Sequence, residues 1–360
     1  MAEAEIAGSE GFAGRMVTMA NEAMLALMVS IGHRTGLFDV MAGLPAATSQ
    51  EIASAAGLNE RYVREWLGAM TTGRIVDHDG GTGTFSLPAD RAAWLTRAAG
   101  LNNLAIMTEY VGLLAPVEDQ IVDCFRNGGG VPYSGYPKFQ ALMAEDSGAV
   151  QDATLIEVTL PLVPGVTGRL GQGIDVADVG CGSGHAINLM ARAFPRSRFT
   201  GFDVSEAGIA AAREEAAGMG LANARFEVRD AAELGETASF DFVTSFDAVH
   251  DQARPDLMLT GICRALRPDG VYLCVDIVAS RTLAENLDHT LGPFLYTVSC
   301  MHCMSVSLAS GGMGLGSMWG EQKAREMLGG AGFTSVRTAR VEGDVANICY
   351  IATKGQTSRH

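Results

Sequence analysis

The alternation of short β-branched segments with alanine-rich segments after Pro164 limits the possible folds of this chain most strongly. The strand-like segments are IDVADVG, RFTGFDV, ARFEVRD, FDFVTSF and VYLCVDIV, and between them stand AINLMARAF, AGIAAAREEAAGMG and LMLTGICRAL. Strands that alternate with helices form a mostly parallel sheet with helices on both faces. The sequence therefore predicts an α/β, doubly wound domain over 164–357.

The region before Pro164 shows the apolar spacing of helices. The apolar residues that recur at this spacing within 20–36 are Met24, Leu25, Leu27, Met28 and Ile31. Thr48 or Ser49 can cap a short helix, and Asn59 can cap a second helix that extends through Met70. The N-terminal part is therefore expected to be mostly helical.

Two short strands are predicted after these helices, at 74–77 and 84–87, with a turn at 79–81 between them. A helix-turn-helix followed by such a hairpin is a winged helix. We expect a winged-helix domain over 1–97, acting in dimerisation or as a lid, and a helical connector over 98–163 that contributes to the pocket. The apolar helix within 20–36 favours a homodimer.

Acidic residues exceed basic ones throughout. The net charge is -15, with 41 acidic and 26 basic residues. Within residues 1–100, four Asp and seven Glu stand against seven Arg. Because such a surface repels phosphate groups, nucleic-acid and membrane partners are not expected, and a DNA-binding regulator is a minor alternative.

The seven cysteines are scattered, without the spacing of a disulfide framework, so reduced thiols are expected. The segment MAEAEIAGSE is acidic and lacks the basic and apolar regions of a secretory signal, and the chain has no long uninterrupted apolar stretch. These features predict a cytoplasmic protein.

A glycine-rich motif, DVGCGSGH at 178–185, follows the first strand of the alternating region. Its three glycines let a ligand approach backbone N–H groups at a helix N-terminus. A dinucleotide fingerprint would need a small residue at position 185, where His185 stands. Asp178 fits a positively charged or amine-bearing ligand better than a pyrophosphate.

Acidic residues also follow the next two strands. Asp203 can accept hydrogen bonds from both hydroxyls of a ribose, and Asp230 can accept one from an adenine amino group. Together with the glycine-rich motif, these positions indicate an adenosine that carries no phosphate.

The motifs DVGCGSG, GFD, RDA, FDFVTSFD and ALRPDG, in this order, resemble those of class I S-adenosylmethionine-dependent methyltransferases. The winged helix and the segment MWGEQKAREMLGGAGF resemble a bacterial subgroup of two-domain small-molecule methyltransferases with an Rv2258c-like N-terminal domain. The resemblance implies a Rossmann-like sheet, S-adenosylmethionine as cofactor and S-adenosylhomocysteine as product. The residues that it assigns to the cofactor are Tyr136, Asp178, Gly180, Cys181, Gly182, Asp203, Val204, Asp230, Ala231, Ser245 and Phe246.

His250 and Asp251 follow the fourth strand and resemble the His-Asp pair of two-domain O-methyltransferases, in which the histidine is the general base. An imidazole can take a hydroxyl proton near neutral pH, and we expect Asp251 to orient it. The family usually has tryptophan after this pair, where this chain has Gln252. A structural role for His250 is the alternative.

An insert at about 279–318 is longer than usual for such a fold and is expected to form a lid over an apolar acceptor. The residues assigned to the acceptor are Phe294, His302, Met304 and Met313. The phenylalanine and the two methionines would also fit an ordinary helical core.

His302 lies in the segment CMHC, which supplies at most half of a zinc site. A sharper alternative places iron between His250 and His302, as in related C-methyltransferases of 2-oxo acids. O-methylation of a small, mostly apolar molecule is favoured, and a metal is not. A methyltransferase fold that uses the cofactor only structurally is a further alternative.

Overall fold

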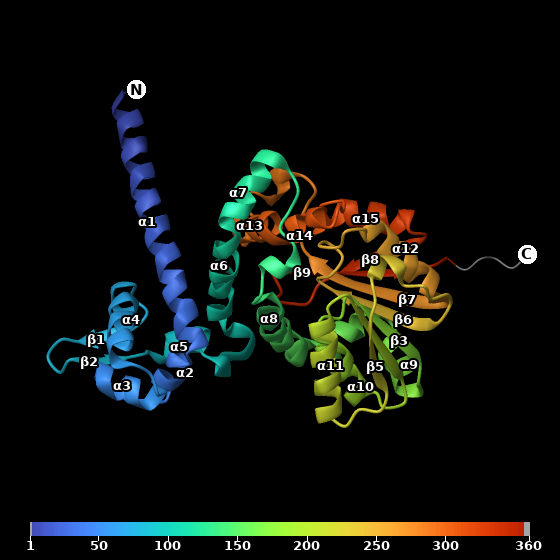
Figure 1. Ribbon diagram of the computed structural model, residues 1–360, viewed down its shortest axis with the longest axis horizontal. Coiled ribbons are helices and arrows are strands. Elements are labelled where there is room, and N and C mark those ends of the chain that lie inside the picture. Colours follow the sequence, from blue (N-terminus) through green and yellow to red (C-terminus); the bar gives the residue numbers. More distant parts are fainter. Residues whose placement is uncertain (1, 356–360) are drawn as a thin grey trace, which may run out of the picture. The chain divides into compact units, whose positions relative to one another are not determined.

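The computed structural model describes the backbone of residues 2–355 and the side chains from Gly11 onward (Figure 1). It divides the chain into two compact units, Met1–Ala115 and Pro116–His360. The expected domain end at 357 lies outside the described residues, and the domain boundaries at 97 and 163 stay predictions. No helix in the described part of the chain is long and apolar enough to cross a membrane.

The first unit is mostly helical. Its helices are α1 (Ala2–Arg34), α2 (Leu37–Ala42), α3 (Ser49–Ala56), α4 (Glu60–Thr72), α5 (Ala89–Leu95), η1 (Arg97–Asn102), η2 (Leu104–Thr108) and α6 (Glu109–Leu114). Its strands are β1 (Asp77–Asp79) and β2 (Thr84–Ser86), which pair antiparallel. The short helix η3 (Ala115–Val117) follows.

The expected caps of the winged helix are present. Thr48 caps α3 in a capping box with Glu51, and the Asn59 side chain accepts a hydrogen bond from the backbone of α4. The first wing strand begins at Asp77 rather than at 74, because Arg74 has a φ of 62° and the chain turns there.

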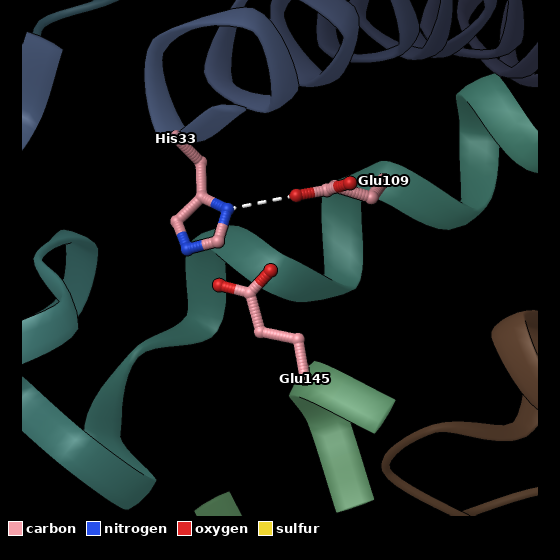
Figure 2. A group of neighbouring side chains, drawn as sticks. All are labelled: His33, Glu109 and Glu145. Carbon is pink, nitrogen blue, oxygen red and sulfur yellow. Dashed lines mark hydrogen bonds and ion pairs between the residues drawn. The ribbon is translucent and has the colours of Figure 1, made fainter. Parts of the chain in front are cut away.

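The burial of side chains on helix α1 differs along its length. Near its C-terminal end, the buried His33 lies with Nδ1 2.8 Å from Oε1 of Glu109 in α6 (Figure 2). Leu25 and Met28 pack against the core of the same unit. By contrast, every residue from Gly11 to Met24 is exposed. The apolar residues expected to form a dimer surface are therefore partly used inside the unit.

The second unit contains the sheet. Its strands are β3 (Asp175–Val179), β4 (Arg198–Asp203), β5 (Ala224–Val228), β6 (Phe240–Phe246), β7 (Leu266–Ile277), β8 (Ser335–Ala339) and β9 (Asn347–Thr353). Its α-helices are α7 (Glu118–Asn127), α8 (Phe139–Thr154), α9 (Val166–Gln172), α10 (His185–Ala193), α11 (Glu206–Gly218), α12 (Pro255–Ala265), α13 (Gly292–Val298), α14 (Met304–Ala309) and α15 (Gly320–Gly330). The shorter helical segments are η4 (Tyr133–Gly135), η5 (Leu155–Thr159), η6 (Leu160–Leu162), η7 (Ala231–Glu233), η8 (Leu283–Asn286) and η9 (Ser299–Cys303), of which η5 and η9 are π-helical.

The seven strands have the order β5-β4-β3-β6-β7-β9-β8. The strands from β5 to β7 are parallel, whereas β9 runs antiparallel to both β7 and β8. The expected α/β, doubly wound sheet is confirmed. The two C-terminal strands had not been predicted.

Side chains on the two faces of the sheet form separate cores. Val176 packs in one core with α9, α10 and α11, whereas its neighbour Ala177 packs in the other with α12 and α15. This alternation explains why the strands are almost continuously apolar, since both faces are buried. With both faces covered by helices, the strand ends are left as the place for polar chemistry. The helices around the sheet can be followed in Figure 1.

Candidate functional site

The chain leaves β3 towards β4 on one side, and β6 lies on the other side of β3. In open α/β sheets, ligands bind at the carboxyl ends of the strands where the order reverses. Asp178, Asp203 and Asp276 lie at the ends of β3, β4 and β7, and His250 lies in the turn that follows β6. The polar residues of the sequence thus gather at the expected edge.

The glycine-rich loop after β3 requires glycine for two separate reasons. Gly180 has a φ of 79°, and a Cβ there would lie 2.5 Å from the Cβ of Ala248. Gly182 has a φ of 53°, but a Cβ there would meet no atom within 4 Å. Backbone at Gly182 therefore faces open space, which fits a ligand that approaches the main chain closely.

Asp203 closes this loop. Its Oδ2 accepts a hydrogen bond from Gly182 N at 2.8 Å, and its Oδ1 accepts one from Ser205 N, also at 2.8 Å. Burial nevertheless raises the pKa of Asp203 above its ordinary value. Each carboxylate oxygen keeps a second lone pair, so the pair of oxygens suits two neighbouring hydroxyl donors.

Asp178 is a buried carboxyl below the same loop. The Thr244 hydroxyl donates a hydrogen bond to its Oδ1 at 2.8 Å. Burial raises the pKa of Asp178 to about 7. Since no arginine or lysine in the described part of the chain pairs with it, a cationic ligand would stabilise its charged form.

The other residues assigned to the cofactor differ in exposure. Cys181 is half-buried, and burial raises the pKa of its thiol well above the ordinary value. Val204 and Asp230 are exposed, and Asp230 caps η7 by accepting a hydrogen bond from Ala232 N. Ala231 is buried. Their contacts with a cofactor stay predictions.

Ser245, Phe246 and Tyr136 also differ from one another in burial and in hydrogen bonding. Ser245 is fully buried and its hydroxyl bonds to that of Tyr272 at 2.6 Å, so only its backbone can meet a ligand. Phe246 is half-buried at the end of β6. Tyr136 is buried and donates a hydrogen bond to the carbonyl of Met301.

His185 occupies the third glycine position of a dinucleotide motif. Its ring lies 2.6 Å from Glu215 in α11 and 3.1 Å from Asp152 in α8. The imidazole therefore links three helices of the unit, a structural role that the sequence had not indicated.

His250 lies after β6 and is held by Asp276 of the neighbouring strand. The atoms Nδ1 and Oδ1 are 2.7 Å apart, and Trp319 Nε1 donates to the same oxygen at 3.1 Å. Burial works against a charged imidazole, but the Asp276 carboxylate and the Cys303 thiol outweigh it and hold the pKa of His250 well above its ordinary value.

The sequence had suggested that Asp251 orients His250. In the structure Asp251 is not its partner. Its Oδ2 accepts a hydrogen bond from the Tyr133 hydroxyl at 2.5 Å, and its Oδ1 accepts one from Gln252. The two residues are consecutive in a turn, whereas Asp276 stands at the end of the adjacent strand. The turn after β6 places His250 beside the neighbouring strand β7, so its partner is not its neighbour in the chain.

Sequence reasoning missed Asp276 and Trp319 as polar partners of His250. Asp276 is the one acid within VYLCVDIV, so its place at a strand end offered a signal. Trp319 stands in the segment MWGEQKAREMLGGAGF, and the sequence does not show where its indole N–H points.

His302 lies in η9 and is 1% exposed. Its ring stacks on Phe139 at a centroid distance of 4.0 Å, and its Nε2 is buried without a hydrogen-bond partner. Burial, together with the charge of His250, lowers the pKa of His302 to about 3. His302 is therefore a neutral imidazole.

The remaining residues assigned to the acceptor lie along the insert. Phe294 in α13 and Met304 at the start of α14 are half-buried, whereas Met313 is 50% exposed. A groove of about 610 Å³ between α7 and α13 is lined by Phe125, Met301 and other mostly apolar side chains, but by neither His250 nor His302. This groove holds none of the acid-base groups of the sheet edge.

Neither His250 nor His302 belongs to a group of three side chains that could hold a metal ion, as far as the described residues extend. A metal ion between His250 and His302 would therefore have these two histidines as its only ligands from the described residues. The arrangement instead suits proton transfer at His250 beside a loop that admits a ligand.

Comparison with known proteins shows which domains this chain resembles. A model of the Rv2258c-like winged HTH domain matches residues 23–97, and a methyltransferase-domain model matches residues 170–329. A fatty-acid O-methyltransferase of Mycolicibacterium smegmatis is 34% identical over 106 residues, which are 29% of this chain and 38% of that protein. The chain thus spans about two fifths of the length of that curated relative.

Solved structures show the same fold over nearly the whole chain. Human N-acetylserotonin methyltransferase, solved in complex with SAM, matches with a TM-score of 0.69 and 17% identity, covering 95% of this chain and 98% of that one. Mitomycin 7-O-methyltransferase matches with a TM-score of 0.71 and 18% identity, covering 96% and 99%. The chain therefore joins an Rv2258c-like winged helix-turn-helix domain to a methyltransferase domain of the class I fold.

Proposed function

We propose that this protein is an S-adenosylmethionine-dependent methyltransferase that methylates a hydroxyl group of a small, mostly apolar molecule. The observation that carries the proposal is the His250–Asp276 pair beside the open glycine-rich loop. A base held by a carboxylate and a loop that admits an adenosine are the two parts that such a reaction requires.

The residues at the sheet edge fit the cofactor. The Gly180–Gly182 backbone and the Asp203 carboxyl would hold the adenosine part, while Asp178 would stabilise a positive charge. When bound, S-adenosylmethionine supplies a methyl group attached to a positively charged sulfur. The buried, uncompensated Asp178 supports this assignment, because a cation lowers the cost of its ionisation.

In this proposal His250 takes the proton of the acceptor hydroxyl at Nε2, since its Nδ1–H donates to Asp276. Trp319 holds the Asp276 carboxylate in place. The elements around the pair exclude water, and His250 itself is only 6% exposed. Correct placement of the hydroxyl and exclusion of water would supply most of the catalysis.

Calorimetric titration with S-adenosylmethionine, followed by measurement of S-adenosylhomocysteine formation with a panel of phenols and alcohols, tests the proposal. We expect binding and, with some members of the panel, turnover. Absence of binding would contradict the proposal. Binding without turnover on any acceptor would favour the alternative in which the cofactor has only a structural role.

A DNA-binding role is not favoured by the winged helix. The arginines of α4 are paired with glutamates of the same helix: Arg61 with Glu65 at 2.5 Å and Arg64 with Glu60 at 3.1 Å. A recognition helix needs unneutralised cations for phosphate contacts. A gel shift that weakens with salt would contradict this interpretation.

We further propose that the protein is a homodimer formed through the first half of α1. Phe12, Met16 and Met19 lie on one face of this half and are 60%, 47% and 51% exposed. An isolated helical segment is marginal in water, so an apolar face of this length is best stabilised by a second copy.

A cytoplasmic location is proposed from the thiols. All seven cysteines are free, and four of them are buried. Buried free thiols are typical of proteins that stay in a reducing compartment. Cell fractionation tests this; recovery of the protein in an extracytoplasmic fraction would contradict it.

A further inference from the structure

Three aromatic rings surround His302, and together with it they form what we call the aromatic box: Tyr133, Tyr136, Phe139 and His302. Phe139 stacks on the imidazole at 4.0 Å with an interplanar angle of 15°. Tyr136 and Tyr133 meet it edge-on, at centroid distances of 4.7 and 5.5 Å. The hydrogen bond from Tyr136 to the carbonyl of Met301 fixes one wall of the box to η9.

The box contains a polar atom without a partner. His302 is 1% exposed, and its Nε2 makes no hydrogen bond. Leaving a buried polar group unpaired costs about 1–3 kcal/mol, so such an atom calls for a partner, which can be an ordered water or a ligand. Because the imidazole is neutral, Nε2 can donate or accept, depending on the tautomer. A hydroxyl group can satisfy either tautomer.

The surroundings of the box are acidic. The carboxyls at this sheet edge are those of Asp178, Asp203, Asp247, Asp251 and Asp276. None of them forms a hydrogen bond or an ion pair with an arginine or a lysine anywhere in the described residues. Burial raises the pKa of Asp203 and of Asp251, which shows that negative charge is already disfavoured there. A carboxylate-bearing acceptor would add to this repulsion.

Tyr133 connects the box to the proposed base. Its ring lies against His302, and its hydroxyl reaches Asp251, the residue directly after His250. One phenol therefore spans the distance between the box and the neighbourhood of the base. His250 also interacts with the Cys303 thiol, and Cys303 directly follows His302, so the two histidines belong to one neighbourhood that a flat acceptor of similar size would occupy.

We propose that the aromatic box binds the methyl acceptor, and that this acceptor is an uncharged aromatic molecule with two polar substituents, a hydroxyl at His250 and a second hydroxyl bonded to Nε2 of His302. This inference rests on the proposed function and adds the substrate class to it. His302 determines specificity, because an acceptor that lacks the second hydroxyl leaves Nε2 unpaired.

The test compares resorcinol, hydroquinone, phenol, 3-hydroxybenzoate and 4-hydroxybenzoate as probes. Their dissociation constants are measured by ligand-observed NMR on the full-length protein, with and without S-adenosylhomocysteine. We expect at least one of the two diols to bind about 10-fold or more tightly than phenol, and both hydroxybenzoates to bind more weakly than phenol.

His302→Phe keeps an aromatic ring in the box but removes Nε2. We expect the diol-to-phenol ratio to fall to about 1 in this variant, while phenol binding changes by less than about 3-fold. His302→Gln restores a neutral hydrogen-bonding group and should recover part of the ratio. Tyr296→Phe, which removes the hydroxyl bonded to Asn286 outside the box, serves as the control and should leave the ratio unchanged.

A wild-type ratio near 1 for both diols would overturn the proposal without the use of any variant. A ratio that survives in His302→Phe would overturn the role of Nε2, and tight binding of a hydroxybenzoate would overturn the acceptor class. Calorimetry with S-adenosylmethionine on the same samples distinguishes a failure of this inference from a failure of the proposed function. If the cofactor binds but the diol preference is missing, this inference fails while the proposed function stands.

Discussion

The Nδ1 atom of His250, in the turn after β6, lies 2.7 Å from Oδ1 of Asp276 at the end of the adjacent strand β7. The hydrogen bond fixes the ring, so Nε2 is the nitrogen left to accept a proton. The same carboxylate favours the imidazolium form. These two effects give the site a specific pH dependence.

We expect methyl transfer to rise with pH through an apparent pKa above 6.5, because only the neutral imidazole can act as a base. In Asp276→Asn the carboxylate is lost while burial remains. The apparent pKa should then fall, moving the rising limb to lower pH, and the plateau rate should drop by about 10²-fold or more as the ring loses its orientation. The pH profile of S-adenosylhomocysteine formation measures both changes.

Asp251→Asn is the matched control, since its carboxyl bonds to Tyr133 instead of His250. Its rising limb should stay closer to that of the wild type. An unchanged limb in Asp276→Asn would show that this pair does not control the proton on the base.

The sequence was sufficient for the parallel part of the sheet and its polar edge, because strand patterns and strand ends are local features. DVGCGSG and GFD predicted β3, β4 and their loops at the right places. The residue that holds His250, Asp276, is distant from it in the sequence. Asp251 is adjacent to His250 in the chain. The pairing of His250 with Asp276 instead depends on β6 and β7 lying side by side, and the spacing of residues in the sequence does not predict this arrangement.

The antiparallel β9 was missed for the same reason. Its segment NICYIAT is an ordinary apolar strand, and only its position between β7 and β8 gives it a direction. The aromatic box also combines Tyr133, Tyr136 and Phe139 with His302, which lies more than a hundred and fifty residues further along the chain. Long-range contacts of this kind require the tertiary structure.

Asp203→Ala should weaken the binding of S-adenosylmethionine by about 10-fold or more, because the ribose loses its acceptors and the loop loses the hydrogen bond to Gly182. Calorimetry measures the change. Glu206→Gln removes an exposed charge three residues further on and should leave the affinity nearly unaltered. Equal affinities for wild type and Asp203→Ala would place the adenosine elsewhere.

Asp178→Asn should stabilise the ligand-free protein and weaken its binding of the cofactor. The folded-state pKa of Asp178 is about 7, above the ordinary 3.8, so its ionisation opposes folding. Between these two values the folded state binds more protons than the unfolded state, and this contribution to the free energy of unfolding falls as pH rises. The full difference corresponds to about 4 kcal/mol.

Urea denaturation at about pH 5 and about pH 8 measures this effect. The gain in stability of Asp178→Asn over the wild type should be larger at the higher pH. A gain that does not depend on pH, or a loss at both values, would mean that Asp178 is not ionised at a cost in the folded protein.

Met16→Lys combined with Met19→Lys should convert the proposed dimer into monomers, because both side chains lie on the exposed apolar face of α1. Light scattering at micromolar concentration gives the mass. Val17→Lys changes a residue that is 62% exposed on another side of the helix and should leave the dimer intact. A wild-type protein that is already monomeric would refute the dimer.

The most direct measurement is the rate of methyl transfer from labelled S-adenosylmethionine by the wild type and by His250→Ala, with and without a chelator. We expect His250→Ala to be slower by about 10²- to 10⁴-fold, with an unchanged affinity for the cofactor and no effect of the chelator on the wild type. Full activity in His250→Ala would contradict the assignment of His250 as the base, and loss of wild-type activity in the chelator would indicate a metal instead.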